Sequence, residues 1–312
     1  MKKIDNLCVL IGPTAIGKTS ISLELADLIN AEIISADSMQ IYKYMDIGSA
    51  KIKEHEMEGI PHHLIDIIYP DEEYTVADYK NQAKKLIRDI NRRGKIPLVV
   101  GGTGLYVNSL VYDLDFTRVK ASEEIRNRLQ ALGDKYGNEY LHSKLTKIDS
   151  ISANKINIED RRRIIRAIEI YEVTGRKMSE QNMNFRKETN DYNISMIGLN
   201  TDRKKLYERI NYRVDKMVGE GLIDEVNMLL EMGYDKNLPS MQGIGYKEVI
   251  MYLEGIISLD EAVNIIKKGT RNYAKRQLTW FKRDNRIKWI YTDDFDNANE
   301  LLISIARQIE IL

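Results

Sequence analysis

The sequence is poor in the residues that form cross-links or metal sites. Cys8 is the only cysteine among 312 residues, which excludes an intramolecular disulfide and a cysteine-based zinc site. There are five prolines, and no Pro-rich linker or low-complexity tract interrupts the chain. Four histidines lack metal-ligand spacing and are expected at the surface or in the core: His55, His62, His63 and His142.

Long apolar runs are also missing. No stretch approaches the roughly 20 apolar residues that a membrane-spanning helix needs. The run Leu7–Ile11, close behind Met-Lys-Lys, is too short for the core of a signal peptide. The sequence therefore predicts a cytoplasmic protein that does not bind a membrane.

The chain has no net charge, because 47 basic residues balance 47 acidic ones. With 43% hydrophobic and 30% charged residues, the composition is typical of a folded protein with one large domain, or a core domain and a smaller one. The charge balance argues against a surface coated with positive charge for nucleic acid. It does not say where the charges cluster.

Short β-branched runs alternate with helical patterns over the first two hundred residues, which predicts a parallel sheet with crossover helices. The expected strands are Leu7–Ile11, Glu32–Ala36, Ile96–Val100 and Ile194–Leu199, with Leu64–Ile68 and Ile287–Ile290 as further candidates. Helical patterns cover Lys18–Asn30, Val76–Arg93 and, as one long stretch, Arg203–Met232.

Residues 122–183 show helical periodicity and no convincing strand. A helical insertion that leaves the sheet and returns to it explains this order. We expect an α/β fold in which residues 1–115 and 194–312 form a P-loop NTPase-like core. This core combines a parallel sheet with a helical C-terminal part. Residues 116–193 are expected to form an inserted, all-helical domain.

A phosphate-binding motif, G-x-x-x-x-G-K-[ST], follows the first expected strand and opens the first expected helix, the context that such a loop requires. Its residues are Gly12, Pro13, Thr14, Ala15, Ile16, Gly17, Lys18 and Thr19. The backbone N–H groups and the helix N-terminus can bind an anion, Lys18 can reach terminal phosphates, and the Thr19 hydroxyl can ligate Mg²⁺. The motif predicts a bound di- or triphosphate without saying which.

Polar residues follow the next expected strands, at the edge of the sheet where ligands bind. Asp37 follows Glu32–Ala36, and Thr103 follows Ile96–Val100 within a Gly-Gly-Thr-Gly turn. Asp37 is equally well explained as a turn cap, and Thr103 as part of a tight turn. The acid that an ATP-hydrolysing protein usually places after such a strand is missing here, which weakens the nucleotidase interpretation.

A basic residue projects into the apolar stripe that begins the Arg203–Met232 pattern. The stripe consists of Leu206, Ile210, Val214 and Met217. Arg213 lies within it and Arg209 lies at its edge; a guanidinium on a core-facing stripe is costly unless an anion meets it. Arg213 is therefore a candidate clamp on the phosphates, with lengthwise snorkelling of its side chain as the alternative.

Together these motifs resemble the tRNA dimethylallyltransferase (isopentenyl-tRNA transferase) family in its short bacterial form. The resemblance runs from about residue 7 to residue 290 through seven segments: 12–19 (GPTAIGKT), 34–42 (ISADSMQIY), 45–51 (MDIGSAK), 61–66 (PHHLID), 100–106 (VGGTGLY), 243–246 (GIGY) and 271–281 (RNYAKRQLTWF). Some members carry a C-terminal zinc finger, which a chain with one cysteine cannot form.

The resemblance implies transfer of a dimethylallyl group from dimethylallyl diphosphate to N6 of the adenosine 3′ to the anticodon, with release of diphosphate. Asp37 matches the general base on the adenine amine and Thr103 a contact to the donor's phosphate side. A carboxylate base suits a weakly nucleophilic exocyclic amine. Lys18, Arg213 and Mg²⁺ suit the charge that develops on the leaving diphosphate.

An RNA partner predicts local basic patches on a neutral chain. One lies at Arg161–Arg166, for which a solvated helix face is the alternative, and one at Lys267–Lys288, where nine basic residues accompany one acid, Asp284. Tyr273, Trp280 and Phe281 in this second stretch can stack on bases or anchor the helix. The candidate tRNA-binding residues are Asp37, Ser38, Met39, Gln40, Thr103, Arg126, Arg162, Arg163, Ile164, Ile165, Arg166, Gln242, Gly243, Ile244, Gly245, Tyr246, Lys247, Lys275 and Arg276.

Three other functions remain open at this point. A small-molecule P-loop kinase explains residues 7–103 but leaves both basic stretches without a role. An adenylate dimethylallyltransferase would use a free nucleotide as the acceptor, and a nucleotide-dependent RNA-binding switch would bind tRNA without turnover. We expect a monomer whose partners are tRNA and dimethylallyl diphosphate.

Overall fold

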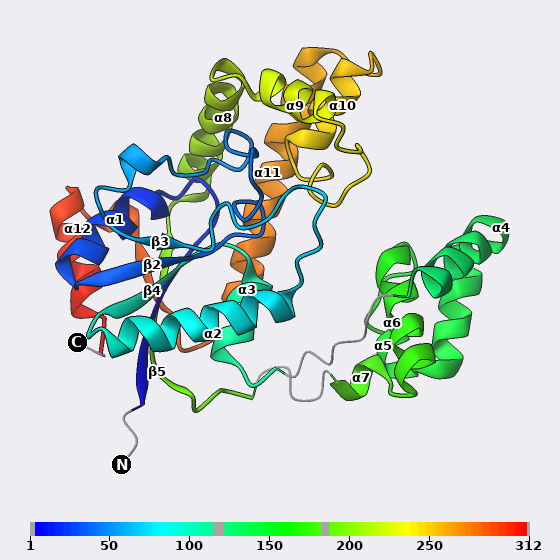
Figure 1. Ribbon diagram of the computed structural model, residues 1–312, viewed down its shortest axis with the longest axis horizontal. Helices are drawn as coiled ribbons and strands as arrows, with labels where there is room; N and C mark the ends of the chain where they lie inside the picture. Colours follow the sequence, from blue (N-terminus) through cyan, green and yellow to red (C-terminus); the bar gives the residue numbers. More distant parts are fainter. Residues whose placement is uncertain (1–3, 115–121, 182–186, 311–312) are drawn as a thin grey trace. The chain divides into compact units, whose positions relative to one another are not determined.

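The computed structural model describes residues 4–114, 122–181 and 187–310, which fall into two compact units (Figure 1). Unit 1 comprises residues 1–111 and 190–312, and unit 2 comprises Tyr112–Thr189. The expected boundary at residues 115–116 and the expected end of the helical stretch at Met183 lie outside the described residues.

Unit 1 is built on a six-stranded sheet whose strands follow the order β3-β2-β4-β1-β5-β6. The strands are β1 (Asp5–Ile11), β2 (Ala31–Ala36), β3 (His62–His63), β4 (Ile96–Gly101), β5 (Tyr192–Asn200) and β6 (Lys288–Tyr291). Every neighbouring pair is parallel. Gly101 pairs with both Ile11 and Ala36, so β1, β2 and β4 end side by side at one edge.

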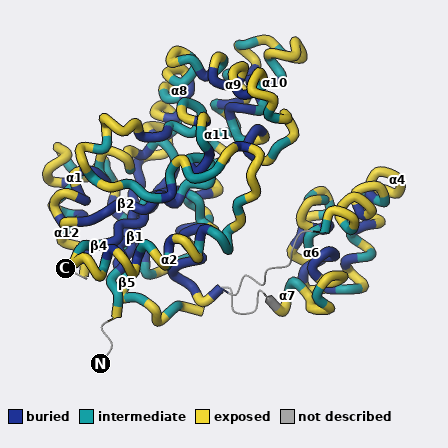
Figure 2. Tube along the Cα trace, in the orientation of Figure 1, coloured by how far each residue is buried: buried dark blue, intermediate teal, exposed yellow. Residues whose placement is uncertain are grey.

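The burial of the central strand β1 shows that the parallel sheet is covered on both faces. Residues 7–11 are all fully buried, as expected of a strand with helices on each side (Figure 2). Cys8 and Leu10 share a hydrophobic cluster with residues of α1 (Lys18–Leu28) and α12 (Ala298–Arg307). Burial also raises the pKa of the Cys8 thiol to about 12.

The prediction of a strand at Leu64–Ile68 is wrong. β3 stops at His63, and the backbone then turns, because Leu64 and Asp66 have φ values of 62° and 53°. A left-handed conformation at alternate residues is incompatible with a strand. Only Ile68 makes an isolated parallel bridge, to Tyr42.

The long helix expected over Arg203–Met232 is two helices, α8 (Arg203–Gly219) and α9 (Leu222–Glu231). Gly221 separates them with a φ of 101°, which a residue with a side chain rarely adopts. The other long helices of unit 1 are α2 (Val76–Arg92), α3 (Gly104–Val111), α10 (Tyr246–Leu253) and α11 (Leu259–Phe281), with 3₁₀ turns at Glu54–Glu56 and Thr292–Asp294.

Helices α8 to α11 form a second hydrophobic core, and the chain that follows β2 enters it. Ile41, Tyr42 and Met45 are buried among Val214 of α8 and residues of α9 and α10. The segment after Asp37 is therefore anchored in a core distinct from the one that covers β1.

Unit 2 is helical, with α4 (Glu123–Ile148), α5 (Ser150–Ala153), α6 (Arg161–Thr174) and α7 (Met178–Gln181). Gly137 interrupts α4 with a φ of 84° and a ψ of 171°. Leu129, Leu141 and Ile164 belong to its own hydrophobic core. Within the three described ranges of the chain, no helix is both long enough and apolar enough to cross a membrane.

Candidate active site

The phosphate-binding motif forms the loop between β1 and α1, at the edge where β1, β2 and β4 end. Ala15 and Gly17 have φ values of 63° and 98°, and Gly17 is the N-cap of α1. Left-handed residues in such a loop turn successive N–H groups towards one point, and the helix adds the positive end of its dipole. The loop is therefore shaped to bind an anion.

Lys18 lies across this loop, where its Nζ donates hydrogen bonds to the carbonyl oxygens of Gly12 (3.0 Å) and Pro13 (2.8 Å). Burial and the nearby charge of Arg213 together lower the pKa of Lys18 to about 7, against the opposing effect of Asp37. A bound phosphate would favour the protonated amine.

A cavity of about 120 Å³ brings most of the predicted diphosphate residues together with Asp37 and Arg213, while the third predicted catalytic residue, Thr103, is not part of its lining. Its lining comes from the phosphate loop, the ends of β2 and β4, α8 and α11, and includes Lys18, Thr19, Asp37 and Arg213. The charge of Asp37 acts on both Lys18 and Arg213. One cavity thus contains a carboxylate opposite a cationic cradle.

The ends of β2 and β4 are joined through Thr103. Its Oγ accepts the backbone N–H of Ser38 (3.0 Å) and donates to the Ser38 hydroxyl (3.3 Å). Asp37 Oδ1 accepts the N–H of Met39 (2.9 Å), so Asp37 does cap a turn, as the alternative interpretation predicted. The cap uses one carboxylate oxygen, and Asp37 still lines the cavity.

The structure distinguishes the two arginines of α8. The Arg213 guanidinium reaches the cavity and lies 3.5 Å from the Thr14 hydroxyl, which it contacts as a donor, and burial lowers its pKa. Arg209 is exposed and is absent from the cavity lining. Arg213 is the arginine placed to contact a phosphate in this cavity.

Helix α11 supplies two further residues at the site: Gln277, which the sequence did not single out, and Tyr273, which was expected only to stack on bases or to anchor the helix. Gln277 lines the cavity, and its Oε1 accepts the N–H of Thr14 (2.9 Å). The pKa of Tyr273 is raised to about 12 by burial and by Asp37, while the neighbouring side chains of Thr103 and Gln277 act to lower it. The sequence signal that could have pointed to them is their position within the family-like segment 271–281.

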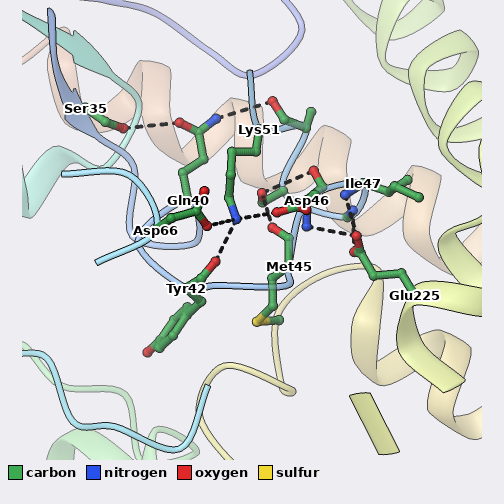
Figure 3. A network of polar contacts seen from close by, with 12 residues as sticks. Ser35, Gln40, Tyr42, Met45, Asp46, Ile47, Lys51, Asp66 and Glu225 are labelled. Carbon is green, nitrogen blue, oxygen red and sulfur yellow. Dashed lines mark hydrogen bonds and ion pairs between the residues drawn. The ribbon is translucent and has the colours of Figure 1, made fainter. Parts of the chain in front are cut away.

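A buried lysine holds the segment that follows Asp37 (Figure 3). Lys51 Nζ donates to the carbonyl oxygen of Tyr42 (2.7 Å) and pairs with the carboxylates of Asp46 and Asp66, each at 2.5 Å. The Lys51 side chain is only 3% exposed, so losing these partners would leave a buried charge uncompensated.

Glu225 of α9 holds the same segment from the other side (Figure 3). Its carboxylate accepts the consecutive N–H groups of Asp46 (2.8 Å), Ile47 (2.6 Å) and Gly48 (3.0 Å), and the hydroxyl of Tyr246 (2.8 Å). We call residues 45–51 the clamped loop. It presents Ser49 to the cavity, as Gln40 is presented by the turn after β2.

The segments at 37–40 and 242–247, both predicted to contact tRNA, lie next to each other. The Met39 methyl group packs against Gly243, where an added Cβ would come within 2.6 Å of it. Gln242 is exposed and Lys247 is partly exposed. The prediction of an RNA contact by the Tyr246 side chain is wrong, because it is fully buried and bonded to Glu225.

The second basic stretch is less positive in space than in sequence. Lys267 pairs with Asp215 and Lys288 with Glu310, carboxylates that lie outside the stretch, while Arg286 pairs with Asp284. The exposed cations on α11 include Lys268, Lys275 and Arg276. Phe281 is buried, so it anchors the helix.

The first basic stretch forms the start of α6. Ile164 and Ile165 are buried in the core of unit 2, so an RNA contact by their side chains is excluded. Arg162 and Arg163 are exposed, and Arg163 lies 3.6 Å from Asp160. This helix therefore offers only part of the predicted patch.

Two further predicted arginines in unit 2 share one buried carboxylate. Glu169 bonds the guanidinium groups of Arg126 (2.8 Å) and Arg166 (2.7 Å) and accepts the N–H of Ser122 (2.9 Å). Its side chain is fully buried, whereas those of Arg126 and Arg166 remain 44% and 36% exposed. The two arginines are thus fixed and still accessible to a ligand.

Comparisons with known proteins agree with this geometry. A family model described as IPP transferase matches residues 40–284. A tRNA dimethylallyltransferase of Thermoanaerobacter sp. (strain X514) is 50% identical over 305 residues, which is 97% of each chain. One of Acetivibrio thermocellus is 52% identical over 299 residues, or 96% of each chain.

Solved structures give the same result. A tRNA isopentenylpyrophosphate transferase of Bacillus halodurans superimposes with a TM-score of 0.72 at 45% identity, covering 98% of this chain and 97% of its own. A eukaryotic dimethylallyltransferase acting on tRNA gives 0.80 at 30% identity, over 97% of this chain and 79% of its own. The core is thus P-loop NTPase-like, as predicted, and the chain belongs to the IPP transferase family.

Proposed function

We propose that this enzyme transfers the dimethylallyl group of dimethylallyl diphosphate to N6 of the adenosine 3′ to the anticodon in tRNA, and releases diphosphate. The observation that carries the proposal is the cavity in which Asp37 faces Lys18 and Arg213. A general base and a cationic cradle for a leaving diphosphate are the two groups that this transfer needs.

The phosphate loop, residues 12–19, binds the donor's diphosphate. Its N–H groups and the N-terminus of α1 provide hydrogen bonds, while Lys18 and Arg213 provide positive charge. As the bond from the allylic carbon to oxygen breaks, both electrons remain on the diphosphate. These cations stabilise the developing charge, and the Thr103 hydroxyl at the end of β4 would join them by exchanging its hydrogen bond to Ser38 for one to the diphosphate.

Asp37 acts as the base on the acceptor. Its Oδ1 is held by the Met39 N–H, which fixes the carboxylate towards the cavity. The adenine N6 forms the new bond to carbon as the carboxylate accepts its proton, a contribution of about 10²–10⁴-fold for a placed base. The adenine must leave the stack of neighbouring nucleobases in the RNA to reach this position.

The residues present are compatible with Mg²⁺ that is bound together with the donor. Within residues 4–114, 122–181 and 187–310, no group of three or more His, Cys, Asp or Glu side chains could hold a metal ion. Mg²⁺ at phosphate sites is usually held by one or two protein oxygens and by the substrate. Thr19 would supply such an oxygen, and the ion would neutralise diphosphate charge.

The tRNA would be held by separate exposed patches. These include Gln242 and Lys247 near the cavity, Lys275 and Arg276 on α11, and Arg126 and Arg162 in unit 2. Such patches give an affinity that falls as salt rises. We expect the enzyme to act as a monomer in the cytoplasm.

Incubation with dimethylallyl diphosphate or ATP, each labelled, tests the proposal against a small-molecule kinase. The expected result is a label from dimethylallyl diphosphate on tRNA, at the adenosine 3′ to the anticodon, located by mass spectrometry of anticodon-loop fragments. Label that reaches the acceptor from ATP alone would contradict it. AMP offered in place of tRNA tests the adenylate dimethylallyltransferase, and binding of tRNA without any turnover would indicate the RNA-binding switch.

A further inference from the structure

Gln277 is a polar residue on the buried face of α11. The described buried residues of this helix are Ala262, Ile266, Ala274, Gln277 and Phe281. Gln277 is 5% exposed, and a buried amide is costly unless its oxygen and nitrogen both find partners. The partners of this amide therefore indicate why a glutamine is here.

The two ends of the amide bind two different loops. Oε1 accepts the N–H of Thr14 in the phosphate loop (2.9 Å), and Nε2 donates to the carbonyl oxygen of Gly102 after β4 (3.0 Å). β1 and β4 are neighbours in the sheet, so these loops leave it side by side. The amide spans them and sets their separation.

The fit around this amide leaves no spare room. A Cβ added at Gly102 would come within 2.1 Å of Gln277 Nε2, so a side chain there would displace the amide. Thr14 is also contacted from α8, because the Arg213 guanidinium reaches its hydroxyl at 3.5 Å. Thr14 is thus held at its backbone by α11 and at its side chain by α8.

Residues next to Gln277 on α11 face different ways. Tyr273, one turn earlier, lies close enough to Gln277 and Thr103 for their side chains to lower the pKa of its hydroxyl, against the larger raising effect of burial. Lys275 and Arg276, by contrast, are exposed. One short stretch of helix therefore has a face towards the phosphate loop and a face towards solvent.

We propose that Gln277 is a positioning residue for the donor diphosphate: its amide fixes the phosphate loop against the Gly102–Thr103 turn. The proposal rests on the proposed function in assigning the diphosphate to this loop. It separates Gln277 from Lys275, two residues away, which belongs to the RNA-facing side of the helix. Because Gln277 occupies the Thr14 N–H, the N–H groups nearer α1 are the ones left for the diphosphate.

The test compares Gln277→Met, which keeps length and removes both hydrogen bonds, with Lys275→Met as the matched control. The affinity for inorganic diphosphate with Mg²⁺ is measured by calorimetry, and that for an anticodon stem-loop RNA by fluorescence anisotropy. Gln277→Met is expected to weaken diphosphate binding about tenfold or more, the scale of one buried hydrogen bond lost, and to leave RNA affinity within about twofold. Lys275→Met is expected to do the reverse, with a smaller salt dependence of RNA binding.

Unchanged diphosphate affinity in a folded Gln277→Met protein would overturn the inference, as would an equal loss of RNA affinity in both variants. If Gln277→Met does not fold, Tyr273→Phe decides, because it removes the hydroxyl beside the Gln277 amide and keeps the ring. It is expected to weaken diphosphate binding about threefold, and an unchanged affinity would overturn the inference. Diphosphate binding is measured without RNA, so absence of prenyl transfer in the parent protein would contradict the proposed function alone.

Discussion

The phosphate loop and the clamped loop both gather consecutive backbone N–H groups, yet they satisfy them differently. The phosphate loop lines a cavity with Thr14, Ala15, Gly17, Lys18 and Thr19, and Lys18 and Arg213 provide positive charge there. In the clamped loop, the N–H groups of residues 46–48 all bind one carboxylate, that of Glu225. Both have the geometry of an anion site, but only in the second does a carboxylate of the protein take the place of the anion.

The difference follows from what each loop has to hold. A loop that receives a diphosphate must leave its donors to the ligand, at the cost of poorly satisfied N–H groups before binding. A loop that positions side chains, here Ser49, is best fixed in advance, because preorganisation lowers the cost of ordering it later. Glu225 and Lys51 therefore make the clamped loop rigid where the phosphate loop remains receptive.

The largest effect is expected from Asp37→Ala, at the end of β2 and outside both loops. This change removes the base and leaves the phosphate loop intact, so transfer should fall by about 10²–10⁴-fold. Single-turnover assays measure the rate, and stem-loop binding should stay within a few-fold. Asp46→Asn, which alters a carboxylate paired with Lys51 in the clamped loop, is the control and should lose far less. Near-normal turnover in Asp37→Ala would refute the general-base role.

On the phosphate side, Arg213→Ala should lower the transfer rate by roughly 10²-fold, because it removes a cation where leaving-group charge develops. Arg209→Ala, one turn earlier on α8 and exposed, is the matched control and should be close to the parent. Steady-state kinetics with saturating RNA measures both. A loss confined to Arg209→Ala would mean that the wrong arginine has been assigned.

The clamped loop can be weakened on its own with Glu225→Gln. The amide that replaces the carboxylate has one NH₂ group, whose hydrogens would face the backbone N–H groups of residues 46–48, so hydrogen bonds are lost. We expect the free energy of unfolding to fall by about 2 kcal/mol. The KM for RNA should rise about tenfold, while affinity for inorganic diphosphate is retained. Tyr246→Phe removes one of the four bonds to Glu225 and should show a smaller effect in the same direction. Diphosphate affinity that falls with RNA affinity would show that the loops are not independent.

The phosphate loop alone should respond to pH near neutrality. Lys18 has a pKa of about 7, so its amine loses a proton as pH rises through that value and its attraction for diphosphate weakens. Donor affinity should fall roughly fivefold between pH 7 and pH 8 from this group alone. Ionisation of the donor acts in the opposite direction, because it makes the diphosphate more negative. Once the contribution of donor ionisation is subtracted, an affinity that does not fall over this range would contradict the assignment to Lys18.

The sheet and the phosphate loop were predictable because both depend on local signals. β1, β2, β4 and β5 are buried β-branched runs, and the G-x-x-x-x-G-K-[ST] motif fixes a loop between a strand and a helix. Arg213 was found from helical periodicity, since a charge on the apolar stripe of α8 needs a partner. The prediction of a strand at Leu64–Ile68 failed because no local sequence signal marks the left-handed conformation of Leu64 and Asp66.

The contacts between distant segments were not predictable from one sequence. Gln277 and Tyr273 stand in a helical pattern like any other polar and aromatic residues, and only the fold places them at the phosphate loop. Glu225 likewise lies 177–179 residues from the N–H groups that it binds. The positive charge of the Lys267–Lys288 stretch was overestimated for the same reason, because the carboxylates that pair with Lys267 and Lys288, those of Asp215 and Glu310, lie outside the stretch in sequence.

Cys8, buried in the middle of β1 with a raised pKa, has a practical consequence. Thiol reagents act on the thiolate, which this residue scarcely forms near neutral pH. A cysteine introduced at an exposed position outside the proposed RNA contacts, such as Glu139, would therefore be modified selectively. The chain can receive a single spectroscopic label in unit 2, and RNA binding there can be followed without first replacing Cys8.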